Sequence, residues 1–321
     1  MRILLLTRFY LNGQNTHVLS LANQLKRKRL FVYLIASYLD NPAYISWLKR
    51  NGIQFSRSAD VLKLESHLRK YNFDIIHTHS AHTLEPALEL GEKWGVPVVA
   101  TSHYLDFCYL NSLGKTDHII AISEEMKNLL NQKLGVKVPV TVVENGVEIF
   151  PYRKVRKEPR IITCLTRMSN QKEPNFELFC ETALKQGFKV YSVGNWRPQN
   201  SNITSSNWVS NTRPILANSD IVVGTGRTVR EAMAAGCVPI VLGDFWDGSV
   251  NEENVEELRA FNFSGRKSKQ EPTMELITNE LERLRNGNFI YQSRFCHEYA
   301  KQNFAISRIA TETILVYNKL L

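Results

Sequence analysis

The sequence has 321 residues, of which 43% are hydrophobic and 22% are charged. This balance is typical of an ordinary globular protein, and it excludes a disordered chain and a chain built mainly of membrane-spanning helices. The net charge of +9 does not indicate a nucleic-acid-binding protein, because the basic residues are spread along both halves of the chain.

Five cysteines, at positions 108, 164, 180, 237 and 296, are an odd number without closely spaced pairs. Neither a disulfide framework nor a zinc ribbon follows from this spacing, and a reducing compartment explains it most simply. The apolar run near the start, residues 2–6, is too short for a signal peptide, and no stretch reaches the roughly 18 apolar residues of a spanning helix. We therefore expect a cytoplasmic protein.

Short apolar runs alternate with amphipathic segments from the first residues onward. Because parallel strands need a crossover connection, this alternation predicts βαβ units around a parallel sheet. In the first half of the chain, strands are expected at residues 2–6, 31–36, 74–79, 97–102, 117–123 and 140–146. The polar, proline-containing stretch 151–160 then predicts a boundary between a domain of residues 1–150 and a domain of residues 151–321.

The same pattern restarts after this boundary. Strands are expected at residues 160–167, 188–194, 220–224 and 237–243, with helical patterns between them. The sequence therefore predicts an α/β protein with two Rossmann-like domains facing each other across a cleft. Because open parallel sheets bind ligands beyond the carboxyl ends of their strands, we expect the site in that cleft.

Two clusters of basic residues occur in the chain: Lys26, Arg27, Lys28 and Arg29, and the stretch 153–160. Each is compatible with a solvated helix end or a polar linker. The first cluster is also compatible with an anionic membrane surface, where each lysine or arginine contributes about 1 kcal/mol. Peripheral contact with the inner face of a membrane is therefore an open alternative.

The stretch GTGRTVREAMAAGCVPIV, residues 224–241, contains a glycine-rich turn. Gly224, Thr225 and Gly226 follow a predicted strand, and a short helix is predicted over residues 228–236. Glycines let backbone N–H groups approach an anion, and a helix N-terminus adds positive partial charge, so a phosphate fits this turn. The third glycine of the dinucleotide fingerprint is missing. Glu231 also matches a capping box, in which it would bond its own helix.

Six stretches of the chain carry a resemblance to a known family. They are FDIIHTHS (73–80), VVATSH (98–103), TDHIIAISEEMKNLL (116–130), VVENGVE (142–148), LTRMSNQK (165–172) and EAMAAGCVPIV (231–241). In this order and at these separations, they resemble the signature of the GT-B glycosyltransferases of the large retaining group called family 4. The stretches span nearly the whole chain, so the resemblance is specific as a set.

The resemblance implies transfer of a glycosyl group from a nucleotide diphosphate sugar to an acceptor held by the first domain, with retention of configuration. Arg167 and Lys172 match the loop that binds the donor diphosphate, where fixed cations stabilise the charge of the leaving group. Glu231 matches the glutamate that binds the ribose hydroxyls, and His103 matches the histidine that contacts the donor sugar near its reacting carbon. The last helix, about residues 300–320, is expected to pack back on the first domain.

Other donor contacts follow from the same resemblance. Gly13 lies in the first loop, which is glycine-rich in the family and has a single glycine here. Asn145 lies in a turn that lines the cleft, and Arg227 follows the 224–226 turn that cradles the donor. The chain departs from the family at Val223, where a second glutamate usually touches the sugar hydroxyls. No Asp-x-Asp pair occurs, so we expect no metal and no other cofactor.

Two further functions stay open. His77, His79 and His82 have the spacing of metal ligands, which suits a metal-dependent hydrolase, because histidines at i and i+2 on a strand share one face. The valine at position 223 also allows a silent GT-B subunit that binds its ligand without turnover. The sequence leaves the donor nucleotide and sugar open, and the valine at position 223 leaves the retaining or inverting outcome open. The acceptor is also open: a saccharide, a lipid or lipid-linked group, a protein or a small molecule.

Overall fold

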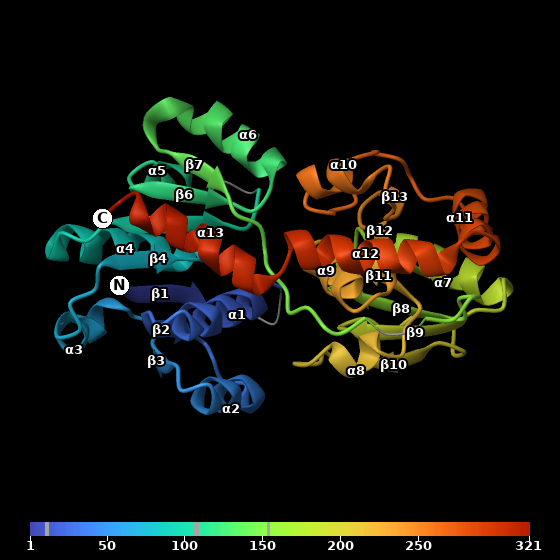
Figure 1. Cartoon of the computed structure of the whole chain (residues 1–321), viewed down its shortest axis with the longest axis horizontal. Coiled ribbons are helices and arrows are strands. Elements are labelled where there is room, and N and C mark those ends of the chain that lie inside the picture. The colour runs from blue at the N-terminus through green and yellow to red at the C-terminus, as the bar shows by residue number, and fades with distance from the viewer. Residues whose placement is uncertain (10–12, 106–108, 153–154) are drawn as a thin grey trace. The chain divides into compact units, whose positions relative to one another are not determined.

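A computed structural model of the chain describes residues 1–9, 13–105, 109–152 and 155–321. The described chain forms two compact units: unit 1 consists of Met1–Gly146 with Ile306–Leu321, and unit 2 consists of Val147–Ala305. Each unit has one β-sheet with helices on both faces (Figure 1). The predicted α/β class with two Rossmann-like domains is confirmed. Cys108 and the first two residues of the basic stretch 153–160 lie outside the described residues.

Unit 1 contains a seven-stranded parallel sheet with the order β3-β2-β1-β4-β5-β6-β7. Its strands are β1 (Arg2–Arg8), β2 (Phe31–Ser37), β3 (Gln54–Ser56), β4 (Ile75–Thr78), β5 (Val98–Ser102), β6 (His118–Ala121) and β7 (Val140–Val142). In the centre of the sheet, Ile3 of β1 pairs with Val32 of β2 on one side and with Ile75 of β4 on the other. The apolar run of β1 is buried on both faces, as expected for a parallel sheet that is covered by helices.

Helices cover both faces of this sheet. One face carries α1 (Gly13–Arg27), α2 (Pro42–Arg50) and α13 (Ile306–Asn318), and the other carries α3 (Glu65–Arg69), α4 (Ala81–Trp94), α5 (Leu110–Leu113) and α6 (Glu124–Leu134). Two short 3-10 helices, η1 (Leu62–Leu64) and η2 (Gly135–Lys137), complete the unit. The side chains of Ile309, Val316 and Tyr317 bury α13 against α1 in the core. Burial of each such apolar side chain stabilises the folded unit by about 1.5–3 kcal/mol. Through these contacts α13 is part of unit 1.

Unit 2 contains a six-stranded sheet with the order β10-β9-β8-β11-β12-β13, in which only the edge strand β13 is antiparallel. Its strands are β8 (Ile161–Thr166), β9 (Lys189–Gly194), β10 (Thr204–Ser206), β11 (Ile221–Gly224), β12 (Val238–Leu242) and β13 (Trp246–Ser249). The four strands predicted for this half correspond to β8, β9, β11 and β12. The two edge strands were not predicted, because they are short and lack a continuous apolar run.

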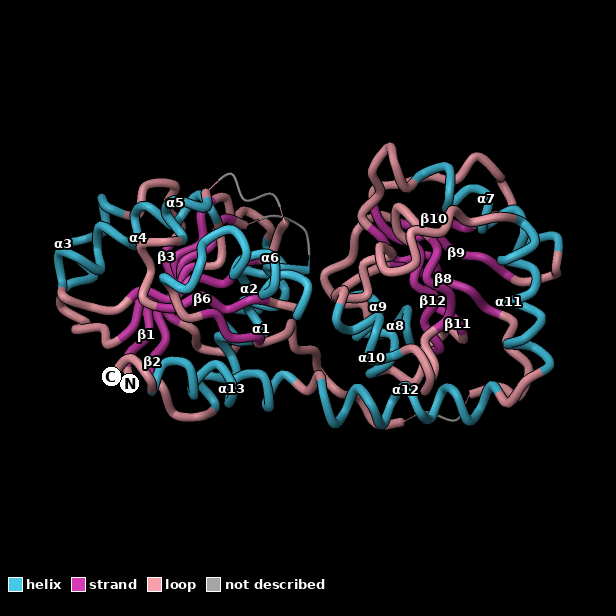
Figure 2. Tube along the Cα trace, turned by 90° about the horizontal axis from the view of Figure 1, so that it is seen from above, coloured by secondary structure: helices cyan, strands magenta, loops and turns pink. Residues whose placement is uncertain are grey.

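The helices of unit 2 also form two layers. On one face lie α7 (Glu173–Lys185) and α11 (Met274–Asn286); on the other lie α8 (Arg213–Leu216), α9 (Arg227–Ala234), α10 (Val255–Ala260) and α12 (Phe289–Asn303). Figure 2 shows the strands of this sheet between the two sets of helices. Because both faces are covered, the ends of the strands are the part of the sheet that is left for loops and ligands.

A buried carboxylate holds the chain where it enters the sheet of unit 2. Asp220 is fully buried and accepts hydrogen bonds from Arg156 Nη1 at 2.9 Å and from the backbone N–H groups of Arg160 and Ile161 at 3.0 Å. Within the basic stretch 153–160, Arg156 is therefore a structural anchor of the sheet and not only a solvated charge.

Candidate functional site

Four loops meet at the carboxyl edge of the unit 2 sheet, which is the edge where open parallel sheets bind ligands. We call them the edge loops: residues 167–172 after β8, 224–226 after β11, 243–245 after β12 and 262–266 after α10. Two of the four, 167–172 and 224–226, contain site residues predicted from the sequence. The 262–266 loop was not predicted as part of a site.

Glycines allow the backbones of the edge loops to come together. The backbone N–H of Phe245 donates to the carbonyl of Gly265 at 3.1 Å. A Cβ atom added to Gly265 would lie 2.6 Å from the amide nitrogen of Gly243, and one added to Gly224 would lie 2.7 Å from the carbonyl oxygen of Leu165. Side chains at these two glycines would collide with backbone atoms, so the close approach of the loops requires glycine.

Lys172 ends the 167–172 loop, at the N-cap position of α7. The neighbouring Asn175 of α7 ties this helix to the 243–245 loop, because its Nδ2 donates to the carbonyls of Gly243 and Asp244 at 3.2 and 2.9 Å. Burial lowers the pKa of Lys172, the carboxylate of Asp244 opposes this shift, and the guanidinium of Arg266 adds to it. The charges of Asp244 and Arg266 thus both act on Lys172, and two cations with one carboxylate favour an anionic ligand.

Arg167, the other predicted cation, begins the same loop, and its side chain is exposed. No hydrogen bond, ion pair or ring contact joins its guanidinium to another residue in the parts of the chain that the structure describes. The structure thus associates Lys172 with the charges of Asp244 and Arg266, and the role of Arg167 stays a prediction.

The 224–226 turn leads from β11 into α9. Gly226 is the N-cap of α9 and has a φ of 58°, a left-handed value that favours glycine. Its backbone N–H donates to the carbonyl of Phe263 at 2.8 Å, so this N–H group is already used. Thr225 contributes its methyl group, which lies against Gly243. The turn therefore takes part in the site through its conformation and its neighbours rather than through the N–H of Gly226.

Glu231 does not form the capping box that the sequence allows. The helix begins at Arg227, and its N-cap, Gly226, receives no side-chain cap hydrogen bond. Instead, Glu231 Oε1 accepts from Arg227 Nε at 2.8 Å, and Glu231 Oε2 accepts from Thr212 Oγ1 at 3.1 Å. The carboxylate is thereby held at the end of the sheet in one orientation, and the predicted Arg227 is the residue that holds it.

Val223 lies within β11 and is fully buried in the core beneath α7. The first position beyond the strand is Thr225. The residue that replaces the usual glutamate is therefore a core residue, and the loop that follows it is short.

Unit 1 has a cluster of histidines at the carboxyl edge of its own sheet. His17 lies in α1, His79 follows β4, and the predicted His103 follows β5. His79 Nδ1 and His103 Nε2 are 3.2 Å apart, and the ring of His17 is centred 6.1 Å from each of the other two rings. The backbone N–H of Gly146 donates to His17 Nδ1 at 3.2 Å, and Gln14 donates to the carbonyl of His79. The sequence indicated His103 but not His17.

His79 and His103 are neutral at physiological pH. Burial lowers the pKa of His103 to about 3. Burial, together with the neighbouring imidazoles, also holds the pKa of His79 well below its usual value. Nδ1 of His103 is buried and has no hydrogen-bond partner among the described residues. A neutral imidazole of this kind is suited to hydrogen bonding with an uncharged hydroxyl group.

The remaining predicted residues of unit 1 lie near this cluster. Gly13 is the first residue of α1, which carries His17. Asn145 is buried at the end of the chain segment that follows β7, and its Oδ1 has no partner among the described residues. At Gly146, a Cβ atom would lie 2.9 Å from Cα of Ile306, so this glycine is required for the packing of α13.

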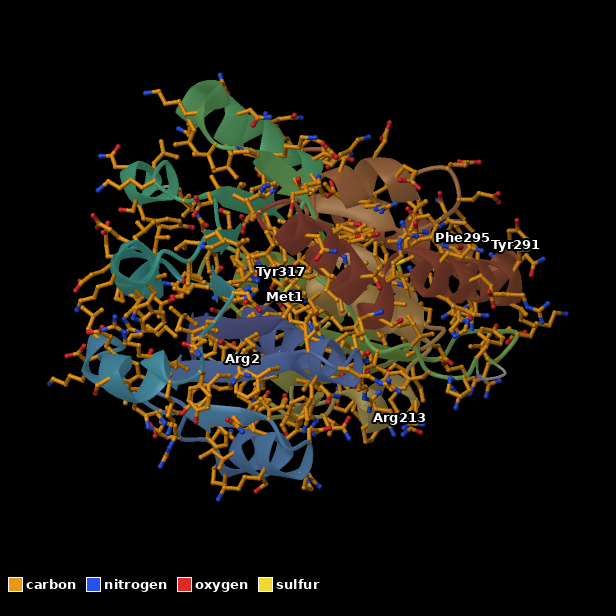
Figure 3. All side chains as sticks on the ribbon, turned by 60° about the vertical axis from the view of Figure 1, so that its left-hand side comes forward. Met1, Arg2, Arg213, Tyr291, Phe295 and Tyr317 are labelled. Atoms are coloured by element: carbon orange, nitrogen blue, oxygen red, sulfur yellow. The ribbon has the colours of Figure 1, made fainter. Side chains whose placement is uncertain are left out.

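The metal cluster considered for His77, His79 and His82 is not formed. His77 Nδ1 bonds the hydroxyl of Tyr317, labelled on α13 in Figure 3, at 2.6 Å, and His77 Nε2 bonds the hydroxyl of Thr101 at 2.7 Å. Both ring nitrogens of His77 are therefore occupied, and His82 is exposed on α4. Within residues 1–9, 13–105, 109–152 and 155–321, no group of three potential metal ligands is arranged to hold a metal ion.

Comparisons with known proteins agree with this fold. Residues 11–149 match the sequence profile of Glycosyltransferase Family 4. The fold is similar to that of Anabaena HepE, solved with UDP and glucose, with a TM-score of 0.75 and 14% identity over 99% of this chain and 100% of HepE. It is also similar to sucrose-phosphate synthase from Thermosynechococcus elongatus, with a TM-score of 0.72 and 14% identity over 100% of this chain and 99% of the synthase.

A third similar structure is a variant of TarM from S. aureus, solved with UDP among its ligands, with a TM-score of 0.71 and 9% identity over 99% of this chain and 100% of TarM. A search of curated protein sequences gave no match. The resemblance predicted from the sequence motifs is confirmed. The chain has the GT-B fold, and its residues 11–149 are similar to Glycosyltransferase Family 4.

Sequence reasoning missed several residues of the edge loops. Asp244, Asn262 and Arg266 belong to no motif that was singled out, and only the stretch NFSGRK, residues 262–267, gave a signal in the form of a short basic loop with a glycine. Thr212, which bonds Glu231, gave no signal at all. In the described part of the chain, no helix has the length and the apolar character needed to cross a bilayer.

Proposed function

We propose that this protein is a glycosyltransferase that binds a nucleotide diphosphate sugar at the edge loops of unit 2. It then transfers the glycosyl group to an acceptor held by unit 1, with retention of configuration and without a metal ion. The observation that carries the proposal is that the edge loops bring the cations Lys172 and Arg266 to the carboxyl edge of the sheet, because Asn175 bonds the 243–245 loop and this loop bonds Gly265. The HepE and TarM structures contain UDP, which supports a nucleotide diphosphate as the ligand.

The chemistry follows from charge. When the glycosidic bond breaks, the leaving nucleoside diphosphate gains negative charge, and fixed cations stabilise that charge in the transition state. Lys172 and Arg266 supply the positive charge that a metal ion would otherwise provide, and the exposed Arg167 adds a further cation on the same loop. Charge-assisted hydrogen bonds of this kind are about twice as strong as neutral ones.

The other predicted residues have supporting roles in this proposal. Glu231, oriented by Arg227, accepts hydrogen bonds from the ribose hydroxyls. The neutral ring of His103 contacts the donor sugar near its reacting carbon and so holds the sugar in position. The turn of Gly224, Thr225 and Gly226 lets the donor approach the backbone closely, and Gly13 and Asn145 line the sugar from unit 1.

A screen of nucleotides tests the proposal. UDP, GDP, ADP and their sugars are added separately to the purified protein, and the melting temperature and donor turnover are measured. A nucleotide at 100 times its Kd stabilises the native state by about 2.7 kcal/mol, so one family of nucleotides should raise the melting temperature clearly. Stabilisation by none of them refutes the proposal. Stabilisation without hydrolysis of the sugar nucleotide or transfer to saccharide, lipid or peptide acceptors favours the silent subunit.

We also propose that the basic end of α1 contacts the cytoplasmic face of a membrane. The side chains of residues 26–29 are exposed, and α2 brings residues 49–50 to the same place. Lys26 Nζ donates to the carbonyls of Asn51 and Gly52 at 2.7 and 2.6 Å, so Lys26 also connects the two helices. The ammonium group of Lys26 is therefore engaged within the protein, and the basic side chains of residues 27–29 are more available to anionic lipids.

Sedimentation with lipid vesicles tests this contact. Vesicles containing phosphatidylglycerol should bind the protein, and vesicles of phosphatidylcholine alone should not. The double replacement Lys28→Glu/Arg29→Glu should reduce binding at least tenfold. Each removed cation costs about 1 kcal/mol, and each new carboxylate adds repulsion from the anionic lipids. Equal binding of the protein to both kinds of vesicle contradicts an electrostatic contact.

A further inference from the structure

Arg230 is an unusual residue for the interior of unit 2. It has no exposed surface and is the largest of the fully buried side chains among the described residues. Its guanidinium lies 5.0 Å from the ring centroids of both Phe263 and Phe304, and its Nη1 donates to Asn262 Oδ1 at 2.8 Å. A buried cation is costly unless it is hydrogen-bonded and faces aromatic rings, and both conditions are met here.

This hydrogen bond fixes the orientation of the Asn262 side chain. A guanidinium has only donors, so the amide must present its oxygen to Arg230 and cannot be turned over. The amide is planar, and its Nδ2 therefore points away from Arg230 in a defined direction. Nδ2 would lie 3.9 Å from a Cβ atom on Gly226, so it faces the 224–226 turn. No hydrogen bond of Nδ2 to an acceptor in the described residues is present.

The backbone holds Asn262 at this distance from the turn. The carbonyl of Phe263 accepts the N–H of Gly226 at 2.8 Å, which ties the 262–266 loop to the start of α9. The same bond removes the N–H of Gly226 from the donors that an anion could use. The side-chain amide of Asn262 is therefore the donor that the neighbouring loop presents at this turn.

We infer that Asn262 is a further donor-binding residue, whose Nδ2 donates a hydrogen bond to a diphosphate oxygen of the nucleotide sugar at the 224–226 turn, and that Arg230 is the positioning residue that aims it. This inference rests on the proposed function of the edge loops. It adds an uncharged donor to the cations Lys172 and Arg266.

A different explanation of Asn262 is purely structural. The residue follows the C-cap of α10 and has a φ of 57°, in the left-handed region where asparagine is common. Its N–H donates to the carbonyl of Arg259 at 2.8 Å, as expected for the end of a helix. If capping were its whole role, aspartate or glycine, which also adopt this conformation, would serve nearly as well.

The replacement Asn262→Asp separates the two explanations. The carboxylate still accepts the hydrogen bond from Arg230 and tolerates the left-handed conformation, but it has no donor and carries a negative charge toward the diphosphate. The protein is titrated calorimetrically with UDP, GDP and ADP, and its melting temperature without nucleotide is recorded. We expect the Kd of the nucleotide that wild type binds to rise at least tenfold, with an unchanged or higher melting temperature.

Two further variants act as controls. Asn72→Asp introduces the same charge at another left-handed asparagine, with a φ of 47°, in unit 1, and should change the Kd less than twofold. Asn262→Gly keeps the left-handed backbone and removes only the amide, and it should raise the Kd about tenfold. If Asn262→Asp and Asn262→Gly both bind within twofold of wild type, the inference is wrong. If wild type binds none of the three nucleotides, the proposed function itself fails, and the inference fails with it.

The positioning role of Arg230 has its own readout. Arg230→Met removes the hydrogen bond to Asn262 and should raise the Kd, and Arg230→Lys should restore part of the affinity. In the presence of Arg230→Met, the further replacement Asn262→Gly should have little additional effect, because the amide is no longer aimed. Fully additive effects on the Kd contradict the positioning role. If Arg230→Met does not fold, the same comparison is made on the background of Arg230→Lys, where the effect of Asn262→Gly should be smaller than in wild type.

Discussion

Replacing Lys172 by alanine tests the electrostatics of the edge loops most directly. If Lys172 makes a charge-assisted hydrogen bond to the diphosphate, its loss costs about 1.5–3 kcal/mol of binding free energy. At about 1.4 kcal/mol for each factor of ten, this corresponds to a rise of roughly 10- to 100-fold in the Kd of the nucleotide. Because burial and Arg266 disfavour the charge of Lys172 in the free protein, the replacement should not lower the free energy of unfolding without ligand.

The pH dependence has a definite sign. The pKa of Lys172 is lowered in the free protein, so this lysine loses its proton at a lower pH than an exposed lysine does. A bound diphosphate favours the protonated form, so binding takes up a proton when the pH is near or above the lowered pKa. The nucleotide affinity should therefore decrease as the pH rises through that range. Lys172→Arg keeps its charge at these pH values and should remove this part of the dependence.

Isothermal titration calorimetry measures both effects. Titrations between about pH 7 and pH 10, in buffers with different ionisation enthalpies, give the Kd and the number of protons taken up. Lys185→Ala is a matched control, because Lys185 is an exposed residue at the opposite end of α7. A Kd for Lys172→Ala within twofold of wild type, or proton uptake that is unchanged in Lys172→Arg, would refute the reasoning.

Two predictions concern stability. Burial lowers the pKa of His77 to about 3, so below pH 6.5 the unfolded chain binds a proton that the native state does not, and the free energy of unfolding decreases as the pH falls. At pH 5 the loss of unfolding free energy from His77 alone is about 2 kcal/mol. Urea unfolding at pH 7 and pH 5 measures this loss. The difference in unfolding free energy between the two pH values should be smaller than in wild type for His77→Gln and unchanged for the exposed His82→Gln. Asp220→Ala leaves two backbone N–H groups and Arg156 without their acceptor and should lower the free energy of unfolding by about 3 kcal/mol. Asp40→Ala, which breaks an exposed ion pair, should change it by less than about 1 kcal/mol, and similar effects of the two replacements would show that burial of the carboxylate is unimportant.

The sequence by itself determined most of the strands and the class of fold. Apolar runs such as residues 2–6 report burial on both faces of a sheet, and this is a local property because neighbouring residues along a strand face the same two layers. The motifs around Lys172 and Glu231 were also visible, because each lies within a short stretch of chain. The short edge strands β10 and β13 were missed because an edge strand need not be apolar.

Only the tertiary structure decided which side chains come together at the edge loops. The order β8-β11-β12 in the sheet brings Lys172 close to Asp244 and Arg266, although these residues lie far apart along the chain. Local sequence patterns carry no information about such contacts, because they depend on strand order and on loops that approach through glycine. For the same reason the sequence could not decide whether Glu231 caps its own helix. The start of α9 at Arg227 excludes the capping box, and the carboxylate instead bonds Arg227 and Thr212, which comes from another loop.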